Sequence, residues 1–120
     1  MTTMPGLIIN CNVSLPSDAC TKLLKALSGL VATLTGKPES FVMTSYREST
    51  MTFGGKDDPC AFAYLTSLGA LGPNNNDLTK GISGLLEEHC GVPANRIYVQ
   101  IVDAEIQGRN FFGWNGTTFA

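Results

Sequence analysis

The strongest constraint on the fold is an internal repeat with an interval of 55 residues. Gly36-Lys37-Pro38 recurs as Gly91-Val92-Pro93, and the same shift aligns apolar residues ahead of each glycine. The aligned pairs are Leu23 with Leu78, Leu27 with Ile82, Leu30 with Leu85 and Val31 with Leu86. Spacings of three and four place such residues on one helical face. Each half is therefore expected to contain an amphipathic helix that ends at a glycine and cannot continue past the proline.

β-rich runs flank both predicted helices. The first half is expected to run from a strand at Leu7–Val13, through a helix with its N-cap in Pro16-Ser17-Asp18 and its end at Gly36, to a strand at Phe41–Tyr46. The second half is expected to run from a strand at Cys60–Leu68, through a loop at Gly69–Asn75 and a helix from Asn76 or Asp77 to Cys90, to a strand at Arg96–Val102. Two tandem β-α-β units with right-handed crossovers predict an α+β fold, a four-stranded sheet with both helices on one face.

The opposite face of this sheet also requires cover. The run Cys60-Ala61-Phe62-Ala63-Tyr64-Leu65 is nearly continuously apolar, which is typical of a strand that is buried on both sides. A chain of 120 residues has no third layer to supply. Association of subunits is therefore expected, and a trimer with its sheets facing inward would provide the cover.

Composition limits the partners and the location. Apolar residues make up 43% of the chain, enough for one core. Eight basic and ten acidic side chains give a net charge of −2, which offers no basic field to a nucleic acid. No apolar run approaches the roughly 20 residues of a membrane-spanning helix. The N-terminus lacks the features of a signal peptide, so synthesis in the cytoplasm is expected, with any export by a route that needs no signal peptide.

The cysteines do not form a recognisable site. Cys11, Cys20, Cys60 and Cys90 include no C-x-x-C pair and match no zinc spacing. A cytosolic chain with a sufficient core does not need disulfides, so these residues are interpreted as small buried hydrophobic side chains. No metal or other cofactor is expected.

An ordered set of motifs identifies a family. In chain order the set consists of Pro5, Asn10-Cys11-Asn12-Val13, Gly36-Lys37-Pro38, Met51-Thr52-Phe53-Gly54-Gly55, Asp58-Pro59-Cys60-Ala61, Ser67-Leu68-Gly69, Asn95-Arg96-Ile97-Tyr98 and Gly113-Trp114-Asn115-Gly116-Thr117-Thr118-Phe119. The set spans Pro5 to Ala120 and resembles macrophage migration inhibitory factor and its relatives, the tautomerase superfamily. The resemblance implies one domain over residues 5–120, an extension at residues 1–4, and a homotrimer with active sites between its subunits.

The same resemblance implies that Pro5, as an N-terminal residue, is a general base that interconverts keto and enol forms. Burial of a terminal secondary amine beside a fixed cation lowers its pKa toward neutrality, so that it can take a proton from a carbon next to a carbonyl. Lys37 is similar to the family cation that holds the substrate carboxylate, and the backbone N–H of Leu68 is similar to a second substrate contact. The resemblance further implies Tyr98 and Gln100 from a neighbouring subunit and an aromatic wall of Phe112, Trp114 and Phe119. The implied substrates are phenylpyruvate-like and dopachrome-like aromatic acids.

The start of the chain departs from the family pattern. Thr2, Thr3 and Met4 separate Pro5 from the initiator methionine. The nitrogen of an internal proline is a tertiary amide without a basic lone pair. Activity is therefore expected only after translation from Met4 or removal of the first four residues.

Structural roles remain open for several of these residues. Pro5 is also a suitable first residue of an edge strand, and Lys37 a suitable exposed cation at a helix C-terminus. Tyr98 and Trp114 are also suitable as structural aromatics of a core or an interface in place of site residues, and His89 is expected only to cap its helix. Two other functions remain open as well. One is a cytokine-like protein that binds a receptor, and the other is a catalytically silent protein that binds small carboxylates.

Overall fold

The structure is a computed structural model that describes residues 5–69 and 71–104. The predictions for residues 1–4 and for Phe112, Trp114 and Phe119 lie outside the described residues. The elements are β1 (Gly6–Cys11), α1 (Ser17–Thr35), β2 (Met43–Glu48), β3 (Ala61–Ser67), α2 (Asn75–Cys90) and β4 (Ile97–Asp103). Two short 3-10 helices, η1 (Glu39–Phe41) and η2 (Ala94–Arg96), precede β2 and β4.

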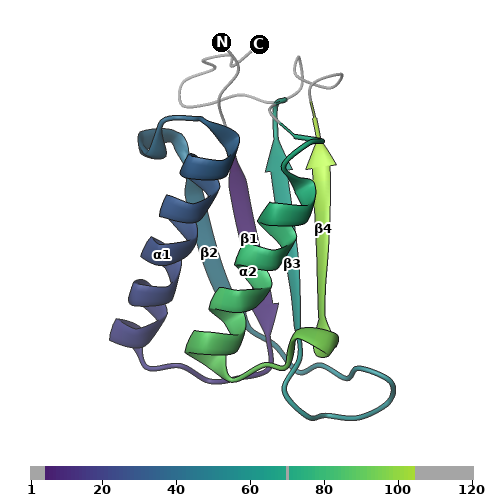
Figure 1. Ribbon diagram of the computed structural model, residues 1–120. Coiled ribbons are helices and arrows are strands. Elements are labelled where there is room, and N and C mark those ends of the chain that lie inside the picture. Colours follow the sequence, from purple (N-terminus) through teal and green to yellow (C-terminus); the bar gives the residue numbers. More distant parts are fainter. Residues whose placement is uncertain (1–4, 70, 105–120) are drawn as a thin grey trace.

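The four strands form one sheet in the order β2-β1-β3-β4. β1 is parallel to β2 and antiparallel to β3, and β3 is parallel to β4. Both helices lie on the same face of this sheet (Figure 1). The predicted α+β fold of two β-α-β halves is confirmed.

The 55-residue repeat is visible in the backbone. Adding 55 to the bounds of β1 gives residues 61–66, which lie within β3 (Ala61–Ser67). α1 and α2 end at Gly36 and Gly91, whose φ angles of 68° and 70° fall in the left-handed region that glycine adopts without steric cost. η1 and η2 follow Pro38 and Pro93 with nearly identical φ angles of −60° and −61°. The two halves therefore share local geometry as well as pattern.

Some predicted details differ from the structure. The strand expected at Phe41–Tyr46 begins later, at Met43, because η1 occupies Glu39–Phe41. The N-cap expected within Pro16-Ser17-Asp18 lies at Pro16, as predicted, although no side chain caps the helix. The Asp18 carboxylate accepts a hydrogen bond from the N–H of Ala19 at 2.9 Å.

The core lies between the helices and one face of the sheet. Its buried members are Leu7, Ile9, Cys11, Leu23, Leu27, Val31, Ala61, Ala63, Leu65, Leu78, Ile82, Leu86, Cys90 and Val92. The strand residues alternate with side chains on the other face, which we call the open sheet face. This face leaves five large apolar side chains exposed: Ile8, Met43, Tyr64, Tyr98 and Val102. Full burial of one such side chain is worth about 1.5–3 kcal/mol, so the open sheet face has a strong tendency to associate.

Candidate functional site

Pro5, Lys37 and Leu68 meet at one end of the sheet. Pro5 directly precedes β1, whose first residue, Gly6, pairs with Thr66 of β3. Leu68 directly follows β3, so it lies at the same end as Pro5. This is the upper end of the sheet in Figure 1, where β1 begins and β3 and β4 finish.

Pro5 is less than 2% exposed. Its carbonyl oxygen accepts a hydrogen bond from the N–H of Met43 at 3.0 Å, which fixes it against the start of β2. The strand that it introduces is an inner strand, since β1 lies between β2 and β3. The alternative role of Pro5 as the first residue of an edge strand is therefore wrong.

Lys37 is buried, with only 6% of its surface exposed. Its ammonium group donates a hydrogen bond to the carbonyl oxygen of Leu68 at 2.8 Å. The alternative role of an exposed cation at the helix end is wrong as well. The repeat explains the burial, because Lys37 corresponds to Val92, a fully buried core residue of the second half. The first half thus holds a charged group at a position where the second half holds an apolar one, and burying a charge is costly unless it is paired.

Leu68 is fixed by a turn whose polar groups the sequence analysis did not single out. Asp103, the last residue of β4, accepts a hydrogen bond from the N–H of Gly69 at 3.1 Å. The buried hydroxyl group of Ser67 donates to the carbonyl oxygen of Gly69 at 3.0 Å, and the N–H of Ala104 donates to the carbonyl oxygen of Ser67 at 2.8 Å. The one available signal was the Ser67-Leu68-Gly69 motif itself, in which Gly69 adopts a φ of 81°. We call residues Ser67 to Gly69 the β3 turn.

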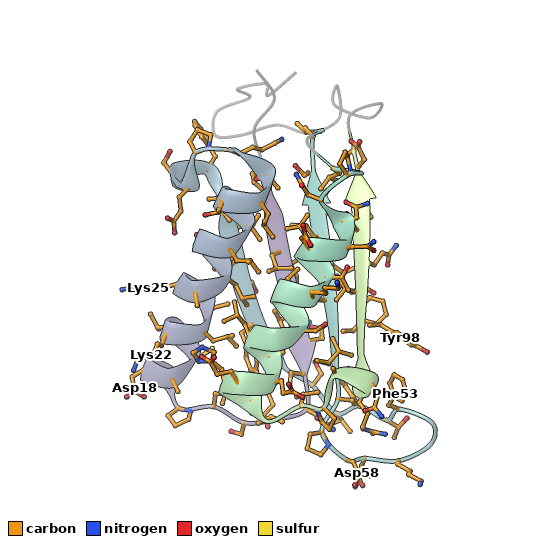
Figure 2. All side chains as sticks on the ribbon, in the orientation of Figure 1. Asp18, Lys22, Lys25, Phe53, Asp58 and Tyr98 are labelled. Atoms are coloured by element: carbon orange, nitrogen blue, oxygen red, sulfur yellow. The ribbon has the colours of Figure 1, made fainter. Side chains whose placement is uncertain are left out.

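Tyr98 and Gln100 do not reach this end within one chain. Tyr98 lies near the start of β4, low in the view of Figure 2, and is 60% exposed. Asp103 lies five positions further along the strand, which corresponds to about 16 Å of extended chain. Gln100 is exposed on the same strand. The structure therefore brings together Pro5, Lys37 and Leu68 but not the side chains of Tyr98 and Gln100. Because Tyr98 is exposed, the alternative that it is a core residue of the domain is wrong.

Tyr98 belongs to an aromatic cluster on the open sheet face. Its ring centroid lies 5.1 Å from that of Phe53 and 6.2 Å from that of Phe62. The guanidinium of Arg96 lies 5.2 Å from the centre of the Phe53 ring, a cation–π distance. These rings, with Met51 and Cys60, line a hollow of about 350 Å³. The largely apolar hollow lies at the end of β4 remote from Lys37.

All four cysteines are free thiols, and Cys11, Cys60 and Cys90 are buried. The Tyr46 hydroxyl donates a hydrogen bond to the carbonyl oxygen of Val13, and the N–H of Val13 donates to the sulfur of Cys11 at 3.5 Å. Interaction with the Cys90 thiol is the main cause that lowers the pKa of Cys11, whereas burial is the main cause that raises the pKa of Tyr46. Within residues 5–69 and 71–104, no three metal-ligating side chains form a cluster. No helix in the same ranges is long and apolar enough to cross a membrane.

Comparisons with known proteins agree with this geometry. The family model for macrophage migration inhibitory factor (MIF) matches residues 4–120. A macrophage migration inhibitory factor homolog of Brugia malayi is 39% identical over 118 residues, which cover 97% of this chain and 99% of the relative. Macrophage migration inhibitory factor of Xenopus laevis is 37% identical over 119 residues, with 98% and 100% covered. The structure of the Toxoplasma gondii protein superposes with a TM-score of 0.85 at 33% identity, covering 92% of this chain and 96% of that one.

Proposed function

Since the chain belongs to the macrophage migration inhibitory factor family of the tautomerase superfamily, we propose that it is a keto–enol tautomerase when Pro5 is its N-terminal residue. The substrates that we propose are phenylpyruvate-like and dopachrome-like aromatic acids. The observation that carries this proposal is the buried ammonium of Lys37 at the same end of the sheet as the buried Pro5. A cation in an apolar setting suits a small carboxylate with an aromatic body.

In this mechanism Pro5 moves the proton. As a terminal secondary amine in an apolar setting near the Lys37 ammonium, it would favour its neutral form at physiological pH. Its lone pair takes a proton from the carbon next to the substrate carbonyl, and the C–H electrons form the new C=C bond. The carbonyl π electrons move onto the oxygen, to which the protonated Pro5 returns the proton. The reverse sequence returns the ketone. Lys37 and the N–H of Leu68 hold the substrate carboxylate, and the reaction needs no redox partner because only a proton changes place.

The proposed site is completed by a neighbouring subunit. The open sheet face exposes Met43 to 74% and Ile8 to 50%, and this apolar surface supports the homotrimer that the family resemblance implied. In that assembly Tyr98 and Gln100 of one subunit would contribute to the site of the next, and so would Phe112, Trp114 and Phe119. The exposure of Tyr98 and its distance from Lys37 in the same chain support a role across the interface.

The test uses two forms of the protein whose N-termini are verified by intact mass. One begins at Pro5 and the other retains residues 1–4. Ultraviolet absorbance follows the enol–keto conversion of phenylpyruvate. The form that begins at Pro5 is expected to turn over the substrate, and the longer form is not. Absence of turnover above buffer in both forms contradicts the proposal, while full activity of a Pro5→Gly variant contradicts the role of the proline.

A second candidate function is a cytokine-like one, in which a trimer exported without a signal peptide binds a receptor. The names of the relatives from Brugia malayi and Xenopus laevis favour it. Receptor pull-down with the Pro5→Gly variant separates the two functions, since binding through the trimer surface does not require the amine. A third candidate, a protein that binds carboxylates without turnover, would bind phenylpyruvate and leave its tautomers unchanged.

A further inference from the structure

We propose that Asp103 is a positioning residue of the tautomerase site, and that it acts by orienting the backbone of Leu68 toward the substrate carboxylate. This inference rests on the proposed function. The Asp103 carboxylate accepts a hydrogen bond from the N–H of Gly69, the residue after Leu68, at 3.1 Å.

The orientation of Leu68 follows from two neighbouring peptide groups. All described peptide bonds are trans, so the C=O and N–H of each peptide group point in opposite directions. The carbonyl of Ser67 points to the β4 side, where it accepts from the N–H of Ala104 at 2.8 Å. The N–H of Leu68, in the same peptide group, therefore points away from β4. In the sheet order the strand on that side of β3 is β1, which begins next to Pro5.

The second peptide group behaves in the same way. The N–H of Gly69 points to Asp103 on the β4 side, so the carbonyl of Leu68 points toward the β1 side. There it accepts the hydrogen bond from the Lys37 ammonium at 2.8 Å. Both polar groups of Leu68 thus face the candidate site, and both are held there by bonds on the β4 side. One of these two holding bonds is made by backbone, and the other is made by the Asp103 side chain.

The Asp103 carboxylate supports the β3 turn where the backbone pairing of β3 with β4 ends. β3 and β4 pair in parallel up to Ser67 and Asp103, and β4 ends there. The Asp103 side chain extends the hydrogen bonding to Gly69, two residues beyond the last paired residue of β3, while the left-handed φ of 81° at Gly69 turns the chain away from β4. Without this acceptor the peptide group between Leu68 and Gly69 is freer to rotate, so the Leu68 carbonyl oxygen and the Lys37 ammonium bonded to it lose their fixed positions.

The experiment compares Asp103→Ala with Asp103→Asn in the form that begins at Pro5. Asn keeps a side-chain oxygen that can accept from Gly69 but removes the charge. Asp103→Ala is expected to raise the KM for phenylpyruvate about tenfold, the lower end for a lost hydrogen bond to a charged group, because Asp103 is exposed. It should leave kcat and the pH profile nearly unchanged, since Pro5 is not altered. Asp103→Asn should restore KM to within about threefold of the parent.

A second measurement does not depend on turnover. Titration of the isotope-labelled parent and of Asp103→Ala with phenylpyruvate, followed at the amide signal of Leu68, reports binding directly. Ser67→Ala, which removes another bond of the same turn, should weaken this binding about fivefold, as expected for a neutral hydrogen bond. An inactive parent contradicts the proposed function. The titration then still tests whether Asp103 supports phenylpyruvate binding, because it does not require turnover. Equal KM and binding in the parent and Asp103→Ala overturn the inference, and so does a shifted pH profile shared by Asp103→Asn and Asp103→Ala.

Discussion

Lys37 and Leu68 are 31 residues apart in the chain, yet the Lys37 ammonium donates to the Leu68 carbonyl oxygen at 2.8 Å inside the domain. The bond ties the segment before β2 to the β3 turn. A single contact therefore joins the cation of the candidate site to the backbone that is proposed to bind the same substrate group.

Replacement of Lys37 by methionine should impair the use of carboxylate substrates selectively. Met retains much of the buried volume but removes the charge, so kcat/KM for phenylpyruvate is expected to fall about 100-fold, the effect of one lost charge-assisted contact. The methyl ester of the same substrate has no carboxylate, so its already low kcat/KM should change little. Steady-state kinetics with both substrates make the comparison. An equal loss for acid and ester would contradict the assigned role of Lys37.

A charge on the open sheet face should prevent association. Ile8 is 50% exposed at the centre of this face, opposite Tyr64 in the β1–β3 pairing. Ile8→Asp would bury an unpaired carboxylate in a trimer interface, a severe cost. Light scattering after size exclusion should give three times the 12.8 kDa chain mass for the parent and one chain mass for this variant. Lys25→Glu on α1, whose side chain projects away from the sheet in Figure 2, is the matched control and should remain trimeric. A trimeric Ile8→Asp variant would exclude this interface.

Two glycines of α2 should respond in opposite ways to alanine. A Cβ at Gly81 would lie 2.7 Å from Cδ2 of Leu30 on α1, whereas a Cβ at Gly84 meets no atom within 4 Å. Alanine gains about 1 kcal/mol over glycine in an exposed helix interior, but overpacking costs about 1–3 kcal/mol. Urea denaturation should therefore show that Gly84→Ala is more stable than Gly81→Ala by at least about 1 kcal/mol. Equal stabilities of the two variants would mean that α1 and α2 accommodate the added methyl group at position 81 without a cost in free energy of unfolding.

Tyr46 should contribute to a loss of stability at alkaline pH. Burial raises its pKa above the ordinary value near 10, so the folded state keeps a proton that the unfolded state releases. The free energy of unfolding is unaffected below that pH and falls above it, by up to about 1.4 kcal/mol per pH unit for one group.

The Tyr46→Phe variant isolates this contribution. It loses the hydrogen bond from the Tyr46 hydroxyl to the carbonyl of Val13, which should cost about 1 kcal/mol at pH 7. Its stability should then decline less steeply than that of the parent between about pH 10 and 11. Urea denaturation at pH 7, 10 and 11 provides the curves. Parallel curves would show that Tyr46 does not titrate differently in the two states.

Much of the fold could be predicted because it rests on local signals. The 55-residue shift predicted both helices, and the Gly-x-Pro stops predicted their ends, which are set by φ angles that few other residues adopt. The start of β2 could not be predicted, since Phe41 and Val42 suit a strand and a 3-10 turn equally well. At the site, motif comparison found Pro5, Lys37 and Leu68. Asp103 was missed because its hydrogen bond to Gly69 spans 34 residues and exists only when β3 and β4 pair.

Lys37 and Val92 occupy matched positions of the repeat, so the second half of the chain serves as an internal comparison for the first. Two copies of one architectural unit sit side by side, and among the residues that the structure describes the first copy buries an ammonium group where the second buries an apolar side chain. The apolar side chain at the matched position of the second copy shows that folding of this unit does not require the charge.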